Sequence, residues 1–158
     1  MKILITEDNI DEEIIPHFTL REFACRDSSV KELVIHPHIL ILTNVLRNIW
    51  GVPIIVTSCY RTVEYNARPK VGGAVDSLHL VGEAIDFLLP RDPASIHAFI
   101  RLCAQVFPNT IDNPKKAYVH CSLYKHPYNW DTIKVERAGI KGPFVGETGK
   151  DKTNQDGG

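Results

Sequence analysis

SLHLVGEAID, residues 77–86, is the most informative segment of the 158-residue chain. It places His79 and Asp86 on either side of Gly82, seven positions apart. Ligand atoms lie about 2 Å from a bound zinc ion, whereas seven residues of continuous strand would separate the two Cα atoms by roughly 23 Å. The chain must therefore fold back if both side chains are to share an ion, and Gly82 permits the bend because glycine has no Cβ.

A third ligand is expected from a neighbouring strand. The apolar segment 117–123 predicts a strand in which Tyr118 and His120 share one face, so His120 is the natural candidate. Two imidazoles and one carboxylate leave a fourth tetrahedral position for water, which is the arrangement of catalytic zinc sites. Spacing alone supports equally well a metal-free hydrogen bond between His79 and Asp86 at a strand turn.

The segments around this motif predict a mixture of helices and strands. Thr19 and Glu22 form a capping box that starts a short helix. A second helix begins at Pro37. The positions of its expected buried face are Ile39, Leu42, Leu46 and Ile49. The β-branched segment 53–58 and the apolar segment 84–89 predict two buried strands.

A third helix begins after the cap residue Asp92. Helices and strands alternate irregularly, so we expect an α+β fold, a single domain in which helices flank a small, mainly antiparallel sheet. Residues 1–17 are expected to form an N-terminal extension and residues 18–141 the domain itself. Residues 142–158 have little to bury and are expected to form a mobile tail.

The composition is that of an ordinary globular protein and excludes several function classes. The 18 Lys and Arg against 19 Asp and Glu leave a net charge of -1, so no basic surface is expected to bind nucleic acid. No apolar run approaches the roughly 20 residues that span a bilayer, and acidic residues interrupt the N-terminal segment where a signal peptide would be apolar. The four cysteines form no CxxC pair and are expected to be reduced and buried.

The motif and two further blocks resemble a known family. SLHLVGEAID fits the pattern S-x-H-x-x-G-x-A-x-D of the zinc D-alanyl-D-alanine carboxypeptidases and dipeptidases, which cut peptidoglycan stem peptides. It also resembles the related zinc domain of the hedgehog proteins, as does KAYVHCSL, residues 116–123. TSCYRTVEYN, residues 57–66, is similar to the SGYR…N segment of the peptidase branch, and residues 18–25 are similar to the opening of short phage and bacterial members.

This resemblance implies one zinc ion per chain, held by His79, Asp86 and His120. Arg61 would lie over the metal cleft, where the family's arginine binds the substrate, and a guanidinium there can bind a carboxylate or steady an oxyanion. The alternative is that Arg61 is an ordinary surface residue after a strand. Ser77 is expected to contact the substrate or to support the metal loop through a hydrogen bond.

A zinc peptidase also requires a group that takes the proton from the metal-bound water. The three positions at which family members carry an acid are occupied here by Ala117, Pro114 and Ser122. Asp112 is the leading candidate for the catalytic base, ahead of Asp76, whereas Glu83 is expected to point away from the metal. Tyr118 is expected to bind the substrate, because a phenol near zinc can donate to an oxyanion.

These features predict a zinc metallopeptidase that hydrolyses peptide bonds of peptidoglycan stem peptides or cross-links, in cell-wall remodelling or phage lysis. The missing acids leave open a non-catalytic zinc-binding domain with a recognition or structural role. The protein is expected to be a monomer that acts on a peptidoglycan peptide, without nucleic-acid or membrane partners. Without a signal peptide, it would be cytoplasmic, or phage-encoded and released to the cell wall at lysis.

Overall fold

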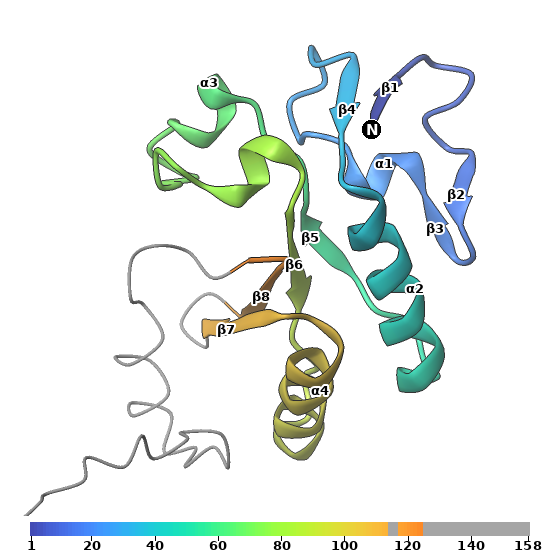
Figure 1. Cartoon of the computed structure of the whole chain (residues 1–158), viewed down its shortest axis with the longest axis vertical. Coiled ribbons are helices and arrows are strands. Elements are labelled where there is room, and N and C mark those ends of the chain that lie inside the picture. Colours follow the sequence, from blue (N-terminus) through green and yellow to red (C-terminus); the bar gives the residue numbers. More distant parts are fainter. Residues whose placement is uncertain (114–116, 125–158) are drawn as a thin grey trace, which may run out of the picture.

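A four-stranded sheet lies at the centre of the fold (Figure 1). The computed structural model describes residues 1–113 and 117–124. The strands of the central sheet are β5 (Val56–Ser58), β6 (Ala84–Leu88), β7 (Asn109–Asn113) and β8 (Tyr118–Ser122), in the spatial order β5-β6-β8-β7. All three neighbouring pairs are antiparallel. With the helices packed against this sheet, the predicted α+β class is confirmed.

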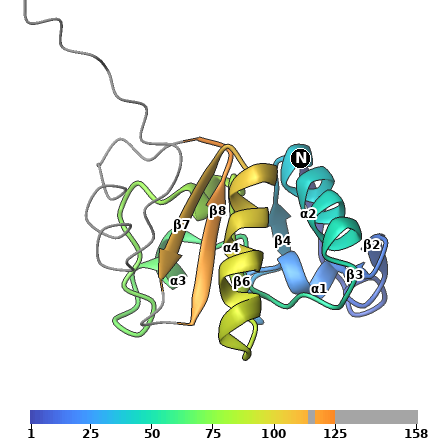
Figure 2. The same ribbon diagram turned by 90° about the horizontal axis from the view of Figure 1, so that it is seen from below.

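Helix α4 and the metal-motif loop lie on opposite sides of this sheet (Figure 2). α4 (Pro93–Val106) covers one face, and the Asp92 carboxylate caps it as predicted, accepting a hydrogen bond from the N–H of Ser95 at 2.8 Å. The other side carries α3 (Val63–Asn66) and the 3-10 turn η1 (Leu78–Val81). The long loop that contains α3 and η1 therefore faces the sheet from the side that α4 leaves open.

Side chains that alternate along the strands give the sheet one apolar face in the core and one polar face. Successive side chains of a strand point to opposite faces of the sheet. Phe87 and Val119 are fully buried, and the ring of Phe87 lies 6.3 Å from the ring of Phe99 in α4. Asp86 and His120, their neighbours in sequence, are paired across β6 and β8 on the opposite face. The apolar layer beneath the sheet thus supports a polar pair above it.

Helix α2 (Pro37–Trp50) packs beside α4 and begins at Pro37 as predicted. Leu46 is fully buried, but Ile49 is 61% exposed, so the predicted buried face is wrong at that position. Three residues of α-helix turn the side chain of Ile49 about 60° away from that of Leu46. Trp50 takes the inward place in the last turn, with its ring 5.0 Å from that of Phe99.

The N-terminal residues form two small antiparallel ribbons. β1 (Lys2–Leu4) pairs with β4 (Glu32–Val34), and β2 (Glu13–Ile15) pairs with β3 (Phe18–Thr19). α1 (Leu20–Phe23) follows β3 and begins where the capping box predicts, because the N–H of Thr19 donates to the Glu22 carboxylate at 2.9 Å. Both ribbons thus pair N-terminal residues with residues that follow position 17.

Three sequence predictions lie outside the described residues. They are the mobile tail at 142–158, the end of the domain at residue 141 and the acid position held by Pro114. Within the described part of the chain, no helix is long and apolar enough to cross a membrane. The four cysteines are buried with free thiols, as expected.

Candidate metal centre

His79 is presented by η1, the turn that precedes β6. Its side chain is almost fully buried, and Nδ1 lies 2.6 Å from the carbonyl oxygen of Cys59. Because a carbonyl can only accept, Nδ1 carries the proton, and Nε2 is left with a lone pair. Gly82 ends the turn in the left-handed region, with φ +70°, and the chain reverses there into β6. The bend predicted from the glycine is therefore present.

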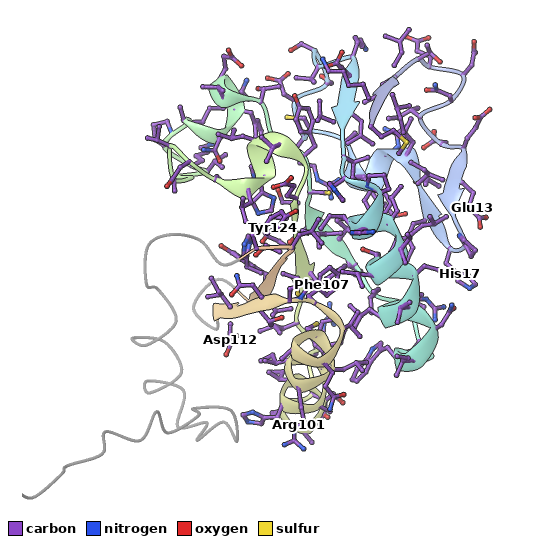
Figure 3. The ribbon with its side chains drawn as sticks, in the orientation of Figure 1. Glu13, His17, Arg101, Phe107, Asp112 and Tyr124 are labelled. Carbon is purple, nitrogen blue, oxygen red and sulfur yellow. The ribbon has the colours of Figure 1, made fainter. Side chains whose placement is uncertain are left out.

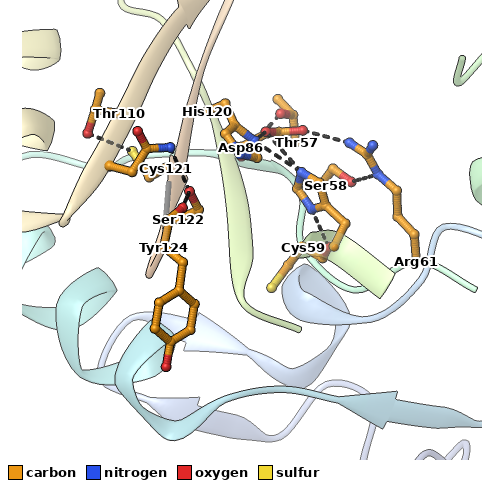
Figure 4. Close-up of polar contacts among 12 residues, drawn as sticks. Thr57, Ser58, Cys59, Arg61, Asp86, Thr110, His120, Cys121, Ser122 and Tyr124 are labelled. Atoms are coloured by element: carbon orange, nitrogen blue, oxygen red, sulfur yellow. Dashed lines mark hydrogen bonds and ion pairs between the residues drawn. The ribbon is translucent and has the colours of Figure 1, made fainter. Parts of the chain in front are cut away.

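Asp86 and His120 are brought together by the strand ladder. They lie directly opposite one another on β6 and β8. Asp86 Oδ1 is 2.8 Å from His120 Nδ1 and 3.2 Å from His79 Nε2. The two histidine nitrogens are 3.3 Å apart. The ligand atoms of the three predicted residues thus all lie within 4.8 Å of one another, and Figure 4 shows Asp86 beside His120.

The spacing of these three atoms fits a zinc ion. Zinc bonds of 2.0–2.1 Å in a tetrahedron place neighbouring ligand atoms about 3.3 Å apart, and the three observed distances are 2.8, 3.2 and 3.3 Å. Two imidazole nitrogens and a carboxylate oxygen also form a donor set that zinc accepts. A tetrahedral ion would retain one position for water, which is the open arrangement of catalytic sites.

The protonation states of the buried ligands suit a metal. Burial lowers the pKa of His79 and outweighs the raising effect of the neighbouring Asp86 carboxylate, so the imidazole is held neutral. Burial alone would raise the pKa of Asp86, but the interactions with His79 and His120 lower it below its ordinary value. A neutral imidazole and an ionised carboxylate are the forms that bind metal ions.

Arg61 lies beside this cluster and not on the open surface. Its Nη2 donates to Asp86 Oδ2 at 2.6 Å, and its Nε donates to Ser58 Oγ at 2.7 Å. Its side chain is only 13% exposed. Its backbone N–H also donates to the carbonyl oxygen of His79 at 3.0 Å. The interpretation of Arg61 as an ordinary surface residue does not fit these contacts.

The metal cluster lines an open cleft of about 500 Å³. Arg61, Ser77 and Tyr118, which the sequence analysis proposed for substrate binding, line the same cleft. Lys70 and Tyr65 also line it and were missed. Their only sequence signal is their place between the arginine block and the metal motif, in the stretch that folds over the ligands.

Asp112 is not brought together with the ligands. Its neighbour Ile111 pairs with His120 and lines the cleft, whereas Asp112 pairs with the buried Val119. Alternation therefore directs Asp112 to the other face of the sheet. In Figure 3 its side chain leaves β7 on the side away from α3.

The other acid positions considered for the base hold no cleft carboxylate either. Ala117 is exposed just before β8, and Ser122 is buried, with its Oγ accepting a hydrogen bond from Asn109 Nδ2 at 2.9 Å. Asp76 is exposed in the loop before η1. Among the residues at 1–113 and 117–124, Asp86 is the one carboxylate that lines the cleft.

His79, Asp86 and His120 thus form a group that could hold a metal ion in an open cleft. Residues 16–122 match the family described as Peptidase M15. The chain belongs to this family, which includes the zinc D-alanyl-D-alanine carboxypeptidases, and it is a metallopeptidase. Searches of curated proteins and of solved structures give no significant match.

Proposed function

We propose that this metallopeptidase uses one zinc ion per chain to hydrolyse peptide bonds in peptidoglycan stem peptides or cross-links. The observation that carries the proposal is the convergence of His79, Asp86 and His120 at the spacing of tetrahedral ligands in an open cleft. Lys70 lines this cleft together with Arg61, whose charge is paired with Asp86, so Lys70 supplies a positive charge to the cleft. Stem peptides are short and carry carboxylates, which suits such a cleft.

Two parts of the hydrolysis, activation of the water and stabilisation of the developing oxyanion, can be related to residues in the cleft, whereas no second carboxylate among residues 1–113 and 117–124 lines it to take the proton. A zinc ion bound there would activate a water molecule and polarise the substrate carbonyl. Tyr118 lies two residues from His120 on the same strand face, and we assign to it a hydrogen bond to the carbonyl oxygen as negative charge develops. The neutral His79 and ionised Asp86 hold their protonation states through burial and pairing.

The test is release of soluble peptides from purified peptidoglycan by zinc-loaded protein. Chelator-treated protein and the variant His79→Ala serve as controls, and mass spectrometry of the products identifies the bond. Cleavage that disappears in both controls supports the proposal. Zinc bound at one ion per chain with no cleavage of any wall fragment would instead indicate a zinc-stabilised recognition domain, for which the lack of a second cleft carboxylate in the described residues is the supporting observation.

We further propose that the protein acts as a monomer, either in the cytoplasm or at the cell wall after phage-induced lysis. Acidic and basic residues are nearly equal in number, with a net charge of -1. This favours a small enzyme that diffuses freely over one that is bound to nucleic acid. Light scattering of the purified protein tests the monomer, and lysis of cells that express it from within tests the phage role.

A further inference from the structure

The two oxygens of Asp86 have different partners. Oδ1 contacts His120 Nδ1 at 2.8 Å and His79 Nε2 at 3.2 Å, so it is the oxygen on the metal side. Oδ2 accepts from Arg61 Nη2 at 2.6 Å. A carboxylate can bind a metal through one oxygen or through both. The ion pair with Arg61 occupies the second oxygen and leaves only the first for a metal.

Arg61 is itself fixed at several atoms. Its Nε donates to Ser58 Oγ at 2.7 Å, and Ser58 lies opposite Asp86 in the β5–β6 ladder. Its backbone N–H donates to the carbonyl of His79, which ties the arginine to a second ligand. With its side chain 13% exposed, Arg61 is a partly buried member of the ligand assembly.

These contacts occupy one edge of the Arg61 guanidinium. Nε and Nη2 already donate to Ser58 and Asp86, which uses two of the five N–H groups. A substrate carboxylate could bind in a bidentate manner along that edge only by displacing the ion pair with Asp86. Among residues 1–113 and 117–124, the other cation that lines the cleft is Lys70, an exposed residue of the loop after α3.

We propose that Arg61 is a positioning residue that acts through Asp86, holding it as a one-oxygen metal ligand, and that Lys70 binds the substrate carboxylate. The first part depends only on metal binding at this site. The second part rests on the proposed peptidase function. The two parts are therefore tested by different measurements.

Zinc affinity is the first measurement, made without substrate by competition with a chromophoric chelator. Loss of a residue that orients a metal ligand typically weakens binding about 10- to 100-fold, and we expect this range for Arg61→Met. The loss of charge alone would instead raise the zinc affinity, because removing a cation near a dication favours metal binding. The matched control Lys70→Met removes a cleft cation that does not contact a ligand, and it should bind zinc as tightly as the unmodified protein or more tightly.

The absorption spectrum of the protein with Co²⁺ in place of zinc measures the coordination geometry. The visible absorption of bound Co²⁺ weakens when the coordination number rises from four to five, as it would if Asp86 bound through both oxygens. We expect weaker absorption for Arg61→Met and an unchanged spectrum for Lys70→Met. If Arg61→Met does not fold by circular dichroism, Ser58→Ala, which keeps the charge but frees Nε, should show the same changes at smaller size.

Kinetics separates the two roles. Lys70→Met should raise KM for a carboxylate-bearing peptide about tenfold with little change in kcat. Zinc affinity retained or increased in Arg61→Met, with an unchanged cobalt spectrum, would overturn the positioning role. Unchanged KM in Lys70→Met would overturn the assignment of Lys70. Absence of peptidase activity in the unmodified protein would refute the proposed function and leave the metal measurements on Arg61 fully interpretable.

Discussion

Gly82 is the position at which a single methyl group should be most damaging. A Cβ there would overlap the carbonyl oxygen of Val34 and lie 2.6 Å from Cα of Ile35. Both neighbours are backbone atoms, so neither can swing aside as a flexible side chain would. The carbonyl of Gly82 also accepts from the N–H of His36 at 2.9 Å, so a shift of the turn would break this bond.

The expected loss can be worked out from these contacts. The left-handed conformation costs a non-glycine residue roughly 1 kcal/mol, and overpacking in a rigid site costs roughly 1–3 kcal/mol. Loss of the hydrogen bond from His36 adds about 1 kcal/mol. We therefore expect Gly82→Ala to lower the free energy of unfolding of the zinc-free protein by about 4 kcal/mol.

Gly51 provides a matched control for this experiment. It has φ +78°, close to the φ of +70° at Gly82, but a Cβ there meets nothing within 4 Å. Gly51→Ala should therefore cost only the conformational contribution, about 1 kcal/mol. Urea unfolding followed by circular dichroism measures both variants. Equal losses for the two alanines would refute the argument that the metal loop is held by close backbone contact.

Three further predictions follow from the site and the core. Asp112→Asn should leave kcat/KM within about twofold, since its side chain is on the face away from the ligands; a loss of 100-fold would place it in the chemistry. In zinc-free protein, the free energy of unfolding should fall as the pH drops below about 6.5, because the folded-state pKa of His79 is lowered and the unfolded chain takes up the proton first. A free energy of unfolding that stays constant from pH 7 to pH 5 would contradict this prediction. Burial raises the pKa values of Cys59 and Cys121, so both thiols should resist alkylation in the native protein and react on unfolding.

The features that could be predicted from the sequence are those with a local physical signal. The caps at Thr19 and Asp92 start helices because their side chains satisfy free N–H groups, whatever the rest of the chain does. The three ligands could be proposed because a bend at Gly82 and strand alternation around His120 are both readable from spacing. Their convergence is observed in the structure.

The features that escaped prediction depend on contacts between distant segments. β1 pairs with β4 across about thirty residues, and nothing in either short strand specifies its partner. β7, with the polar sequence NTIDN, becomes a strand only because β8 offers it an edge. The same pairing decides that Ile111 and not Asp112 faces the ligands, which is why spacing alone could not show on which face of the sheet Asp112 lies.

The ladder between β6 and β8 also has a consequence for the order in which the molecule assembles. Asp86 and His120 are 34 positions apart in sequence, and α4 and β7 lie between them. That loop must close before the third ligand arrives, and closing it costs conformational entropy. We therefore expect the complete centre to form late in folding. A metal ion that needs all three ligands would therefore act mainly by slowing unfolding and would contribute little to the speed at which the chain folds.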